Sequence, residues 1–386
     1  MKVALVIEWL DEWRGGAETS TAQFVRHLLR RGVDLTVFTR SRLSPTPDLQ
    51  VRTLSVTTPT RSRRSKRFAH RAAAAVRRER FDVVHAISPC LAADVYEPRG
   101  GTVAETVVRN LAIRPPGVWR EFKRAAIRLN LKQRALLKLE QKLLGGSHQP
   151  LVIALSDYVM RQLREHYAYP PTRIRKVFNG VDPQPIDAAT RQKDRADVRQ
   201  LYHIGETDLL AIMVAHNFKL KGLGRWIEAL KLLTAGTDLP VRSLVIGKDS
   251  SILWERLVAR AGLSGRLQFT GPTRRVGAFF HAADLLVHPT YYDPCSRVVL
   301  EAMTAGLPVV TTRYDGASEV IENGVNGFVV EEIDAARALA DCVLRLADGD
   351  LRAKMGAEAL KVTERVSMER HAQGVFDVYL EIIGGR

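Results

Sequence analysis

Two carboxylates, Asp293 and Glu301, stand eight residues apart after the apolar run 285–289, which predicts a buried strand. Asp293 and Pro294 predict the N-cap and first turn of a helix that ends at Gly306. In such a helix the two side chains lie about 12 Å apart along the axis and about 80° apart around it. A ligand with hydroxyl groups on both sides of a diphosphate, such as a nucleotide sugar, would reach both acids. Alternatively, Asp293 only caps the helix and Glu301 only faces solvent.

Two lysines follow a second apolar run, 209–214, and come shortly before a glycine. Lys219 and Lys221 lie where a strand ends and a helix is expected to begin, so cations and helix amides together favour an anion there. Simple exposed lysines are disfavoured at this position by the helix dipole. The arrangement needs no metal ion, and no Asp-x-Asp pair has suitable neighbours. We therefore expect a metal-free anion site.

A glycine pair, Gly15 and Gly16, separates the expected first strand, 2–7, from a helix that runs to about Arg31. A strand, two glycines and a helix start form a place where a phosphate can approach the backbone. The pattern lacks the Gly-x-Gly-x-x-Gly of dinucleotide-binding sites. An ordinary turn would also explain the two glycines.

The run Tyr-Tyr-Asp-Pro-Cys-Ser-Arg-Val-Val-Leu-Glu-Ala-Met-Thr-Ala-Gly-Leu-Pro-Val-Val, at residues 291–310, resembles the E-x7-E region of retaining glycosyltransferases of family 4. It is most similar to the bacterial lipopolysaccharide core glucosyltransferases. A later Gly-x-x-Gly-Phe-Val belongs to the same pattern, and the resemblance extends from Gly15 to about residue 330. The sequence departs from the family at the first acid, which is usually Glu and here is Asp293.

The resemblance implies roles for the matching positions. Glu301 would hold the ribose of the donor and Asp293 its hexose, whereas Lys221 matches the family's diphosphate lysine and Lys219 stands in for its arginine. Catalysis would rest on Asp293, Lys221 and Glu301. The implied donor-binding residues are Gly16, Lys219, Lys221, Gly271, Pro272, Asp293, Cys295, Ser296, Arg297, Val298 and Glu301.

The acceptor would contact Gly15, His85 and Asp94. His85 lies inside an expected strand, where a histidine is more often a core residue. Asp94 lies in a stretch, 91–96, that resembles one facing the acceptor in the core glucosyltransferases. The alternative for Asp94 is an ordinary loop acid.

The 386 residues are enough for two domains. Two successive runs of strand–helix alternation predict an α/β chain with two doubly wound parallel sheets, which the resemblance identifies as the GT-B fold with two Rossmann-like domains facing a deep cleft. Ligands bind such sheets beyond the carboxyl ends of the strands. We expect an acceptor-binding domain at 1–182, a nucleotide-sugar-binding domain at 183–366 and a C-terminal helix at 367–386 that crosses back to the first domain.

Basic residues are concentrated in the first half of the chain. Lys and Arg outnumber Asp and Glu by 33 to 15 in residues 1–180, whereas the remaining residues hold 25 and 27. Segment 114–142 contributes nine cations and an apolar stripe, a composition typical of a helix on an anionic membrane surface. The alternative is a domain helix with its stripe packed inward. The cations in question are Arg114, Arg120, Lys123, Arg124, Arg128, Lys132, Arg134, Lys138 and Lys142.

The resemblance, together with these observations, implies a retaining, metal-independent hexosyltransferase. It would move glucose from UDP-glucose, used as a substrate rather than a cofactor, to a sugar hydroxyl of a lipid-linked glycan such as a lipopolysaccharide core. No run of 18 apolar residues and no disulfide spacing occurs, so we expect a cytoplasmic protein, peripheral on the inner face of the cell membrane. A UDP-sugar epimerase of the same fold is the first alternative. A basic RNA-binding protein is the second, but only Phe68 interrupts the arginines of 61–80, so we expect no nucleic-acid partner.

Overall fold

The computed structural model describes residues 1–10, 16–41, 49–58, 61–114, 117–182, 186–331 and 336–385. The chain forms two compact units, which are described separately: unit 1 comprises residues 1–180 with 368–386, and unit 2 comprises residues 181–367. The predicted domain limits, 182 and 366, lie within two residues of these divisions.

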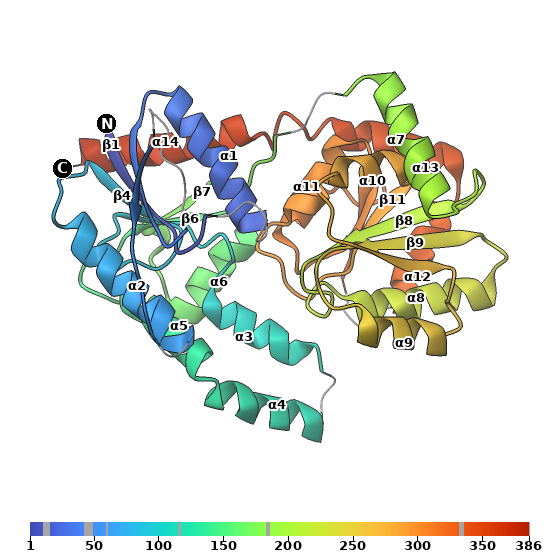
Figure 1. Cartoon of the computed structure of the whole chain (residues 1–386), viewed down its shortest axis with the longest axis horizontal. Helices are drawn as coiled ribbons and strands as arrows, with labels where there is room; N and C mark the ends of the chain where they lie inside the picture. The colour runs from blue at the N-terminus through green and yellow to red at the C-terminus, as the bar shows by residue number, and fades with distance from the viewer. Residues whose placement is uncertain are drawn as a thin grey trace. The chain divides into compact units, whose positions relative to one another are not determined.

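Unit 1 contains a seven-stranded parallel sheet with the order β3-β2-β1-β4-β5-β6-β7 (Figure 1). The chain starts in the middle at β1, moves outward to β3, and returns to β4 on the other side of β1. The sheet is therefore doubly wound, as predicted. Its strands are β1 (Lys2–Val6), β2 (Asp34–Thr39), β3 (Leu49–Thr53), β4 (Val83–Ala86), β5 (Val95–Tyr96), β6 (Leu151–Ala154) and β7 (Ile174–Lys176).

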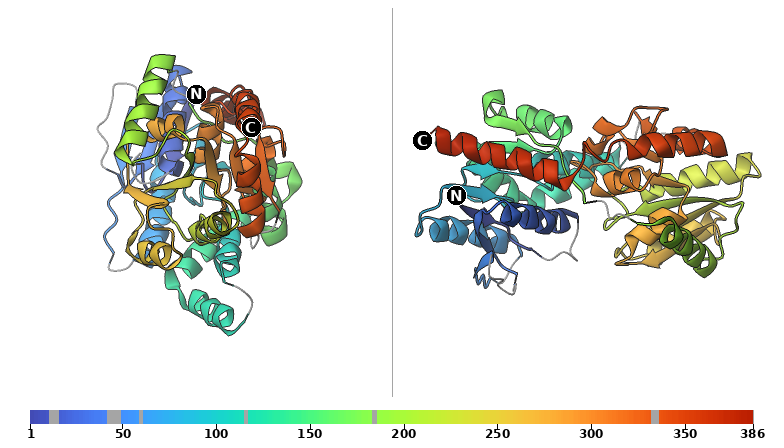
Figure 2. Two further views of the ribbon diagram at one scale, coloured as in Figure 1. Left: turned by 90° about the vertical axis from the view of Figure 1, so that its right-hand side faces the viewer. Right: turned by 90° about the horizontal axis from the view of Figure 1, so that it is seen from above.

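Both faces of this sheet are buried, so its central strands are apolar throughout rather than alternating. Val3 and Leu5 pack with α1 (Gly16–Arg30) and α14 (Met368–Gly384). Ala4 and Val6 face the opposite side, which is covered by α2 (Arg61–Val76), α5 (Leu131–Leu144) and α6 (Asp157–Tyr167). Helix α14, in red in Figure 2, packs beside α1 and contacts β4.

A buried polar cluster joins α14 to the sheet of unit 1. Arg99 donates to Ser20 on α1 at 3.0 Å and pairs with Glu97 at 2.8 Å, and its second terminal nitrogen lies 3.1 Å from His371 Nε2. Burial alone would raise the pKa of Glu97, but Arg99, His85 and His371 together outweigh it and hold the pKa at about 2. Burial lowers the pKa of His371 to about 4, so this ring is neutral. The C-terminal helix is therefore fixed to unit 1 by hydrogen bonds as well as by apolar contact.

Segment 114–142 was predicted as one amphipathic stripe, and this prediction is wrong in part. The segment is divided between α4 (Val118–Leu129) and α5, because Asn130 caps α5 by accepting hydrogen bonds from the amides of Lys132 and Gln133 at 3.1 Å. On α5 the stripe is buried at Leu139 and Leu143. On α4 it is exposed.

Unit 2 contains a six-stranded parallel sheet with the order β10-β9-β8-β11-β12-β13, which is also doubly wound. Its strands are β8 (Leu209–Val214), β9 (Val241–Ile246), β10 (Leu267–Gly271), β11 (Leu285–His288), β12 (Val309–Thr312) and β13 (Gly327–Val330). Its helices are α7 (Ala188–Leu201), α8 (Leu223–Gly236), α9 (Ile252–Arg260), α10 (Val276–Ala282), α11 (Arg297–Thr304), α12 (Ala336–Arg345) and α13 (Gly349–Leu360).

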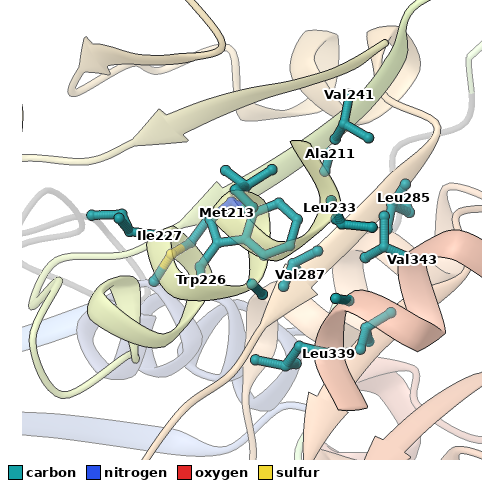
Figure 3. Close-up of a cluster of buried hydrophobic side chains, with 14 of the residues drawn as sticks. Ala211, Met213, Trp226, Ile227, Leu233, Val241, Leu285, Val287, Leu339 and Val343 are labelled. Carbon is teal, nitrogen blue, oxygen red and sulfur yellow. The ribbon is translucent and has the colours of Figure 1, made fainter. Parts of the chain in front are cut away.

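Trp226 on α8 is the largest side chain in the core of unit 2 and is fully buried (Figure 3). It packs with Met213 of β8 and Val287 of β11, on the face that α12 also covers. Its indole N–H donates to Ser243 at 2.8 Å, so the buried polar atom is satisfied. Trp226 therefore contributes to one core with residues of β8, β9 and β11.

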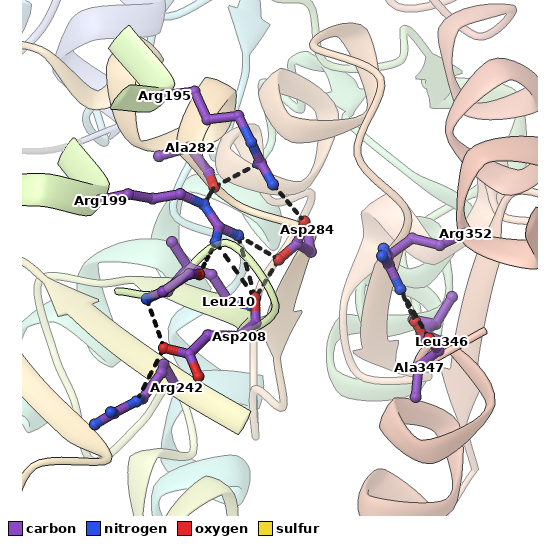
Figure 4. A network of polar contacts seen from close by, with 11 residues as sticks. Arg195, Arg199, Asp208, Leu210, Arg242, Ala282, Asp284, Leu346, Ala347 and Arg352 are labelled. Atoms are coloured by element: carbon purple, nitrogen blue, oxygen red, sulfur yellow. Dashed lines mark hydrogen bonds and ion pairs between the residues drawn. The ribbon is translucent and has the colours of Figure 1, made fainter. Parts of the chain in front are cut away.

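The amino ends of the unit 2 strands are tied by an ionic network (Figure 4). Asp284, just before β11, accepts from Arg199 of α7 and from the amide of Leu210 in β8, both at 2.7 Å. Arg195 adds a second contact to Asp284 at 3.3 Å. This edge is held by internal contacts, and the opposite edge carries the predicted site residues.

Candidate functional site

The predicted donor residues of unit 2 meet at the carboxyl ends of β8 and β11, where the strand order reverses. The loop after β8 carries Lys221, and the loop after β11 carries Asp293. The carboxyl end of the sheet, at the point where the strand order reverses, is the usual ligand position in such sheets. The sequence predicted this placement.

Two glycines allow the backbones to come together at this edge. Gly222 has φ +83, and a Cβ atom there would lie 1.9 Å from the carbonyl oxygen of Pro289. Gly247 has φ +154, and a Cβ atom there would lie 1.7 Å from the carbonyl oxygen of Ala215. Only glycine combines these dihedral angles with this lack of space. The loop after β8 is therefore wedged between the loops that follow β9 and β11.

Lys221 and Asp293 form the central contact of the site. Lys221 Nζ lies 2.5 Å from Asp293 Oδ2 and donates to the carbonyl oxygen of Tyr292 at 3.1 Å. His288 Nε2 lies 3.4 Å from the same carboxylate oxygen. Burial would raise the pKa of Asp293, but Lys221 and His288 outweigh it and hold the pKa well below its usual range. Asp293 is therefore a fixed anion beside a fixed cation.

A second buried acid, Asp315, supports the loop that carries Asp293. Asp315 Oδ1 accepts from the amides of Ser296 at 3.0 Å and Ala317 at 2.9 Å, and Thr311 Oγ1 lies 3.1 Å from Oδ2. Burial, followed by repulsion from Asp293, raises the pKa of Asp315 to about 6. Two neighbouring acids thus have pKa values shifted in opposite directions.

The prediction that Asp293 caps the following helix is wrong. Helix α11 begins at Arg297, and its N-cap residue is Ser296. The backbone of Asp293 instead pairs with the loop after β12, through the bonds Asp293 N to Tyr314 O and Gly316 N to Asp293 O, both 2.9 Å. The predicted axial spacing of Asp293 and Glu301 therefore does not apply. The end of the helix is as predicted, with Gly306 at φ +83 after the last turn.

Glu301 lies on the second turn of α11 and is half-buried. Its Oε1 accepts from Arg297 Nη2 at 2.7 Å, one turn earlier on the same helix. Arg297 is itself mostly buried, so the pair is held in place. The first amides of α11 have no acceptor within the helix, as at every helix start. A carboxylate, a guanidinium and helix amides thus lie within two turns.

The other predicted donor residues lie at the same edge of the sheet or on its loops. Lys219 is exposed on the loop after β8. Gly271, with φ +73, ends β10, and Pro272 follows it. Cys295 and Ser296 are buried just before α11, and Val298 is in its first turn.

The predicted site residues of unit 1 are Gly16 for the donor and Gly15, His85 and Asp94 for the acceptor, and they fall in different settings. Gly16 begins α1 after β1, whereas Gly15 lies outside the described residues. His85 has no exposed surface, and its Nδ1 lies 2.6 Å from Tyr379 Oη, so it is a core residue and not an acceptor contact. Asp94 accepts from the amide of Val84 at 2.8 Å and lies at the amino end of β5. The prediction for Asp94 is also wrong, because this is the opposite edge of the sheet from the strand ends where ligands bind.

Sequence reasoning assigned no role to His288 and Asp315, although both lie within the site. Each occupies or follows the carboxyl end of a strand on one side of β8: His288 ends β11, which neighbours β8, and Asp315 follows β12, the next strand along. A polar residue at that position is the signal that identifies them. Within the described ranges, no group of three or more His, Cys, Asp or Glu side chains is placed to hold a metal ion. None of the helices in those ranges is long and apolar enough to cross a membrane.

Two family models match successive parts of the chain. The model described as Glycosyltransferase Family 4 matches residues 14–185. The model described as Glycosyl transferases group 1 matches residues 194–362, which include the Lys221 and Asp293 site. The two matches fall in unit 1 and unit 2 respectively, apart from the first few residues after the division.

Several curated proteins are similar to the chain. The lipopolysaccharide glucosyltransferase WaaG of Escherichia coli (strain K12) is 30% identical over 53% of this chain and 55% of that protein. The N-acetyl-alpha-D-glucosaminyl L-malate synthase of Bacillus anthracis is 24% identical over 62% of this chain and 61% of that protein. A D-inositol 3-phosphate glycosyltransferase of Acidothermus cellulolyticus is 26% identical over 96% of this chain and 87% of that protein. The first two matches span little more than half the length of those relatives.

Solved structures match over nearly the whole chain. A crystal structure of WaaG, a glycosyltransferase involved in lipopolysaccharide biosynthesis, has a TM-score of 0.82 at 23% identity and covers 98% of this chain and 99% of its own. Anabaena HepE in complex with UDP-glucose has a TM-score of 0.73 at 18% identity and covers 99% and 100%. At these identities the likeness shows the fold, and with the two family matches it confirms the predicted assignment. The chain belongs to glycosyltransferase family 4 and has the GT-B fold.

Proposed function

We propose that the chain is a retaining hexosyltransferase that moves glucose from UDP-glucose to a sugar hydroxyl of a lipid-linked glycan. The observation that carries the proposal is the Lys221–Asp293 pair, held at the strand reversal of unit 2 beside the start of α11. A relative in fold, HepE, has been solved with UDP-glucose. WaaG, to which the chain is similar in sequence, is named as a lipopolysaccharide glucosyltransferase.

In the proposed reaction the bond between the anomeric carbon and the diphosphate breaks, and charge builds on the departing diphosphate. Lys221 and the amides at the start of α11 stabilise that charge, which is usually the largest catalytic contribution. The acceptor hydroxyl attacks the same face of the sugar, and its proton passes to the departing phosphate, so no protein base is required. Glu301 holds the ribose and Asp293 the hexose. The thiol of Cys295, which is buried, takes no part as a nucleophile.

The direct test uses the purified chain, UDP-glucose and a truncated lipid-linked glycan. Transfer is measured as release of UDP together with a glycan one hexose heavier, and NMR of the product gives the anomeric configuration. Retention supports the proposal. Interconversion of UDP-sugars without an acceptor would instead identify an epimerase, and greater thermal stabilisation by RNA than by UDP would identify a nucleic-acid binder.

Replacing Glu301 by alanine is expected to weaken binding of UDP by roughly 10- to 100-fold, because it removes a charged hydrogen bond to the ribose. Isothermal titration with UDP measures the change. Glu358→Ala is the matched control, since Glu358 is also a helical acid of unit 2 that pairs with a cation, Lys361, at 2.6 Å. The control should bind UDP normally. Equal affinity in Glu301→Ala and wild type would remove Glu301 from the donor site.

We further propose that α4 docks the chain on the membrane that carries the acceptor. Val118, Trp119, Phe122 and Leu129 are between 65% and 76% exposed on this helix, an unusual group of large apolar side chains on a surface. The same helix carries Arg124, which pairs with Glu121 at 2.7 Å, and the surrounding unit is strongly basic. Exposed aromatic and basic residues on one amphipathic helix are typical of a helix at a membrane interface. The chain would therefore be peripheral on the membrane surface.

The double substitution Trp119→Ala and Phe122→Ala is expected to lower vesicle binding at least about tenfold, because each aromatic side chain gains on the order of 2 kcal/mol on burial. Co-sedimentation with vesicles that contain phosphatidylglycerol measures the loss. Ile252→Ala with Leu253→Ala on α9 is the control, since both residues are similarly exposed in unit 2. If the control loses binding as much as the α4 variant, the patch on α4 has no special role.

A further inference from the structure

A groove of about 490 Å³ lies between α2 and α5 on the surface of unit 1. Five basic side chains line it, two from α2 and three from α5, and its remaining lining is apolar. Among the residues that the structure describes, no acidic side chain lines it. The basic residues are Lys66, His70, Arg134, Lys138 and Lys142, and the apolar residues are Leu131, Ala135 and Leu139.

The spacing of these residues explains why they share one groove. On α5 they occur at intervals of three and four residues from Leu131 to Lys142, which places them on one face of the helix. Lys66 and His70 are likewise four residues apart on α2, and the two helices pack side by side (Figure 1). The groove is therefore built by two regular helices rather than by loops.

The positive charge of the groove is not neutralised by the protein. Helix α2 contains no acid, and the only acid of α5, Glu140, is fully buried and accepts from Tyr96 at 3.0 Å and from Tyr167. In the part of the chain that the structure describes, none of the five basic side chains belongs to an ion pair. Several close cations without a counter-ion repel one another, so an anion is favoured between them.

The chemistry of the lining selects the kind of anion. The apolar part of the lining consists of Leu131, Ala135 and Leu139. A purely polar ligand such as inorganic phosphate would leave these apolar side chains in contact with water. No aromatic side chain of the described ranges lines the groove, which disfavours stacked nucleotides. Leu131, which is 67% exposed, also continues the apolar surface of α4 through Leu129. A ligand with a phosphate joined to an apolar chain would pair with the basic side chains and cover the apolar ones.

We propose that the groove between α2 and α5 binds one anionic phospholipid of the membrane, with its phosphate between Lys66 and Lys138 and its first methylene groups on Leu131 and Ala135. The inference rests on the membrane docking proposed for α4, to which it adds a discrete lipid site. It involves α2, whose basic run plays no part in that docking. It also differs from a diffuse attraction, in which equally exposed cations contribute alike.

The test compares two double variants that remove the same charge from the same two helices. Lys66→Gln with Lys138→Gln changes the groove, whereas Arg71→Gln with Lys132→Gln removes exposed cations that do not line it. Binding to phosphatidylglycerol vesicles should fall about tenfold further in the groove variant than in the control, as expected for lost charged hydrogen bonds. Equal losses in the two variants would overturn the proposal.

A third variant, Ala135→Trp, fills the groove without changing the charge. It should lose vesicle binding to a similar extent, and normal binding by this variant would also overturn the proposal. Displacement of the wild type from vesicles by equimolar glycerol 3-phosphate would show a site for free phosphate and reject the lipid. Thermal unfolding of each variant with and without UDP is recorded in parallel. A wild type that does not respond to UDP would contradict the transferase, while the vesicle comparison would still decide the groove.

Discussion

Lys221→Ala is expected to lower the rate of hexose transfer by roughly 10²- to 10³-fold, the cost of removing one preorganised group that stabilises transition-state charge. The reason is the position of Lys221, with its ammonium 2.5 Å from Asp293 at the strand reversal of unit 2. Single-turnover transfer from UDP-glucose measures the rate. Lys231→Ala on α8 is the control, because Lys231 is an exposed lysine of the same unit away from the site. A Lys221→Ala variant that keeps more than about a tenth of the rate would contradict the proposed role.

The same substitution should also destabilise the fold, and this effect can be separated from the catalytic one. Without Lys221 the mostly buried carboxylate of Asp293 loses its cation, and breaking such a pair costs more than removing both partners. The double variant Lys221→Met with Asp293→Asn should therefore be more stable than Lys221→Ala in thermal unfolding. Its transfer activity should remain low, because neither charge is restored. Recovery of both properties together would show that Lys221 acts on stability alone.

The architecture of both units could be predicted from the sequence because apolar runs and helical spacing are local signals. The placement of Lys221 and Asp293 at one edge also followed, since parallel strands bring their carboxyl ends together. The first residue of α11 could not be predicted from the sequence. Asp293 and Pro294 are typical of a helix start, but the backbone of Asp293 pairs instead with the loop after β12. That pairing joins residues about twenty positions apart and has no local signature.

Two other errors have the same kind of cause. Asp94 precedes a strand of only two residues, β5, which is too short to be recognised in the sequence, so the edge of the sheet on which Asp94 lies could not be predicted. The stripe of segment 114–142 keeps helical spacing through Asn130, although Asn130 ends one helix and caps the next. His85 is buried against Glu97 and Tyr379. These two partners come from other parts of the chain, and no local pattern predicts them.

The contacts of Asp315 indicate which hydrogen bond its carboxyl group donates when it is protonated. Thr311 Oγ1 lies 2.9 Å from the carbonyl oxygen of His288 and 3.1 Å from Asp315 Oδ2, but a hydroxyl has only one proton to donate. When Asp315 is protonated, it donates to Thr311, and Thr311 donates to His288. Both acceptors are then satisfied. Asparagine reproduces this arrangement, because its amide group also donates on that side while its oxygen still accepts from Ser296 and Ala317.

Asp315→Ala is therefore expected to lower the free energy of unfolding by about 2–6 kcal/mol, since it leaves two buried amides, those of Ser296 and Ala317, without an acceptor. Asp315→Asn should be close to wild type at low pH. Denaturant unfolding measures both values. The alanine variant should also bind UDP more weakly, because the Ser296 amide fixes the start of α11. An alanine variant as stable as the wild type would show that Asp315 does not support the site.

The pH dependence of Asp315 gives the last prediction. Its folded pKa of about 6 lies above the value near 4 of an unfolded aspartate, so between these values the folded state holds the extra proton. The free energy of unfolding contributed by Asp315 is therefore largest below about pH 4, falls as pH rises to about 6, and is constant above it, a change on the order of 2 kcal/mol. Asp293, whose pKa is lowered, loses its contribution only at lower pH. Relative to Asp315→Asn, the wild type should lose stability between about pH 4 and 6, and a constant difference across that range would contradict the raised pKa.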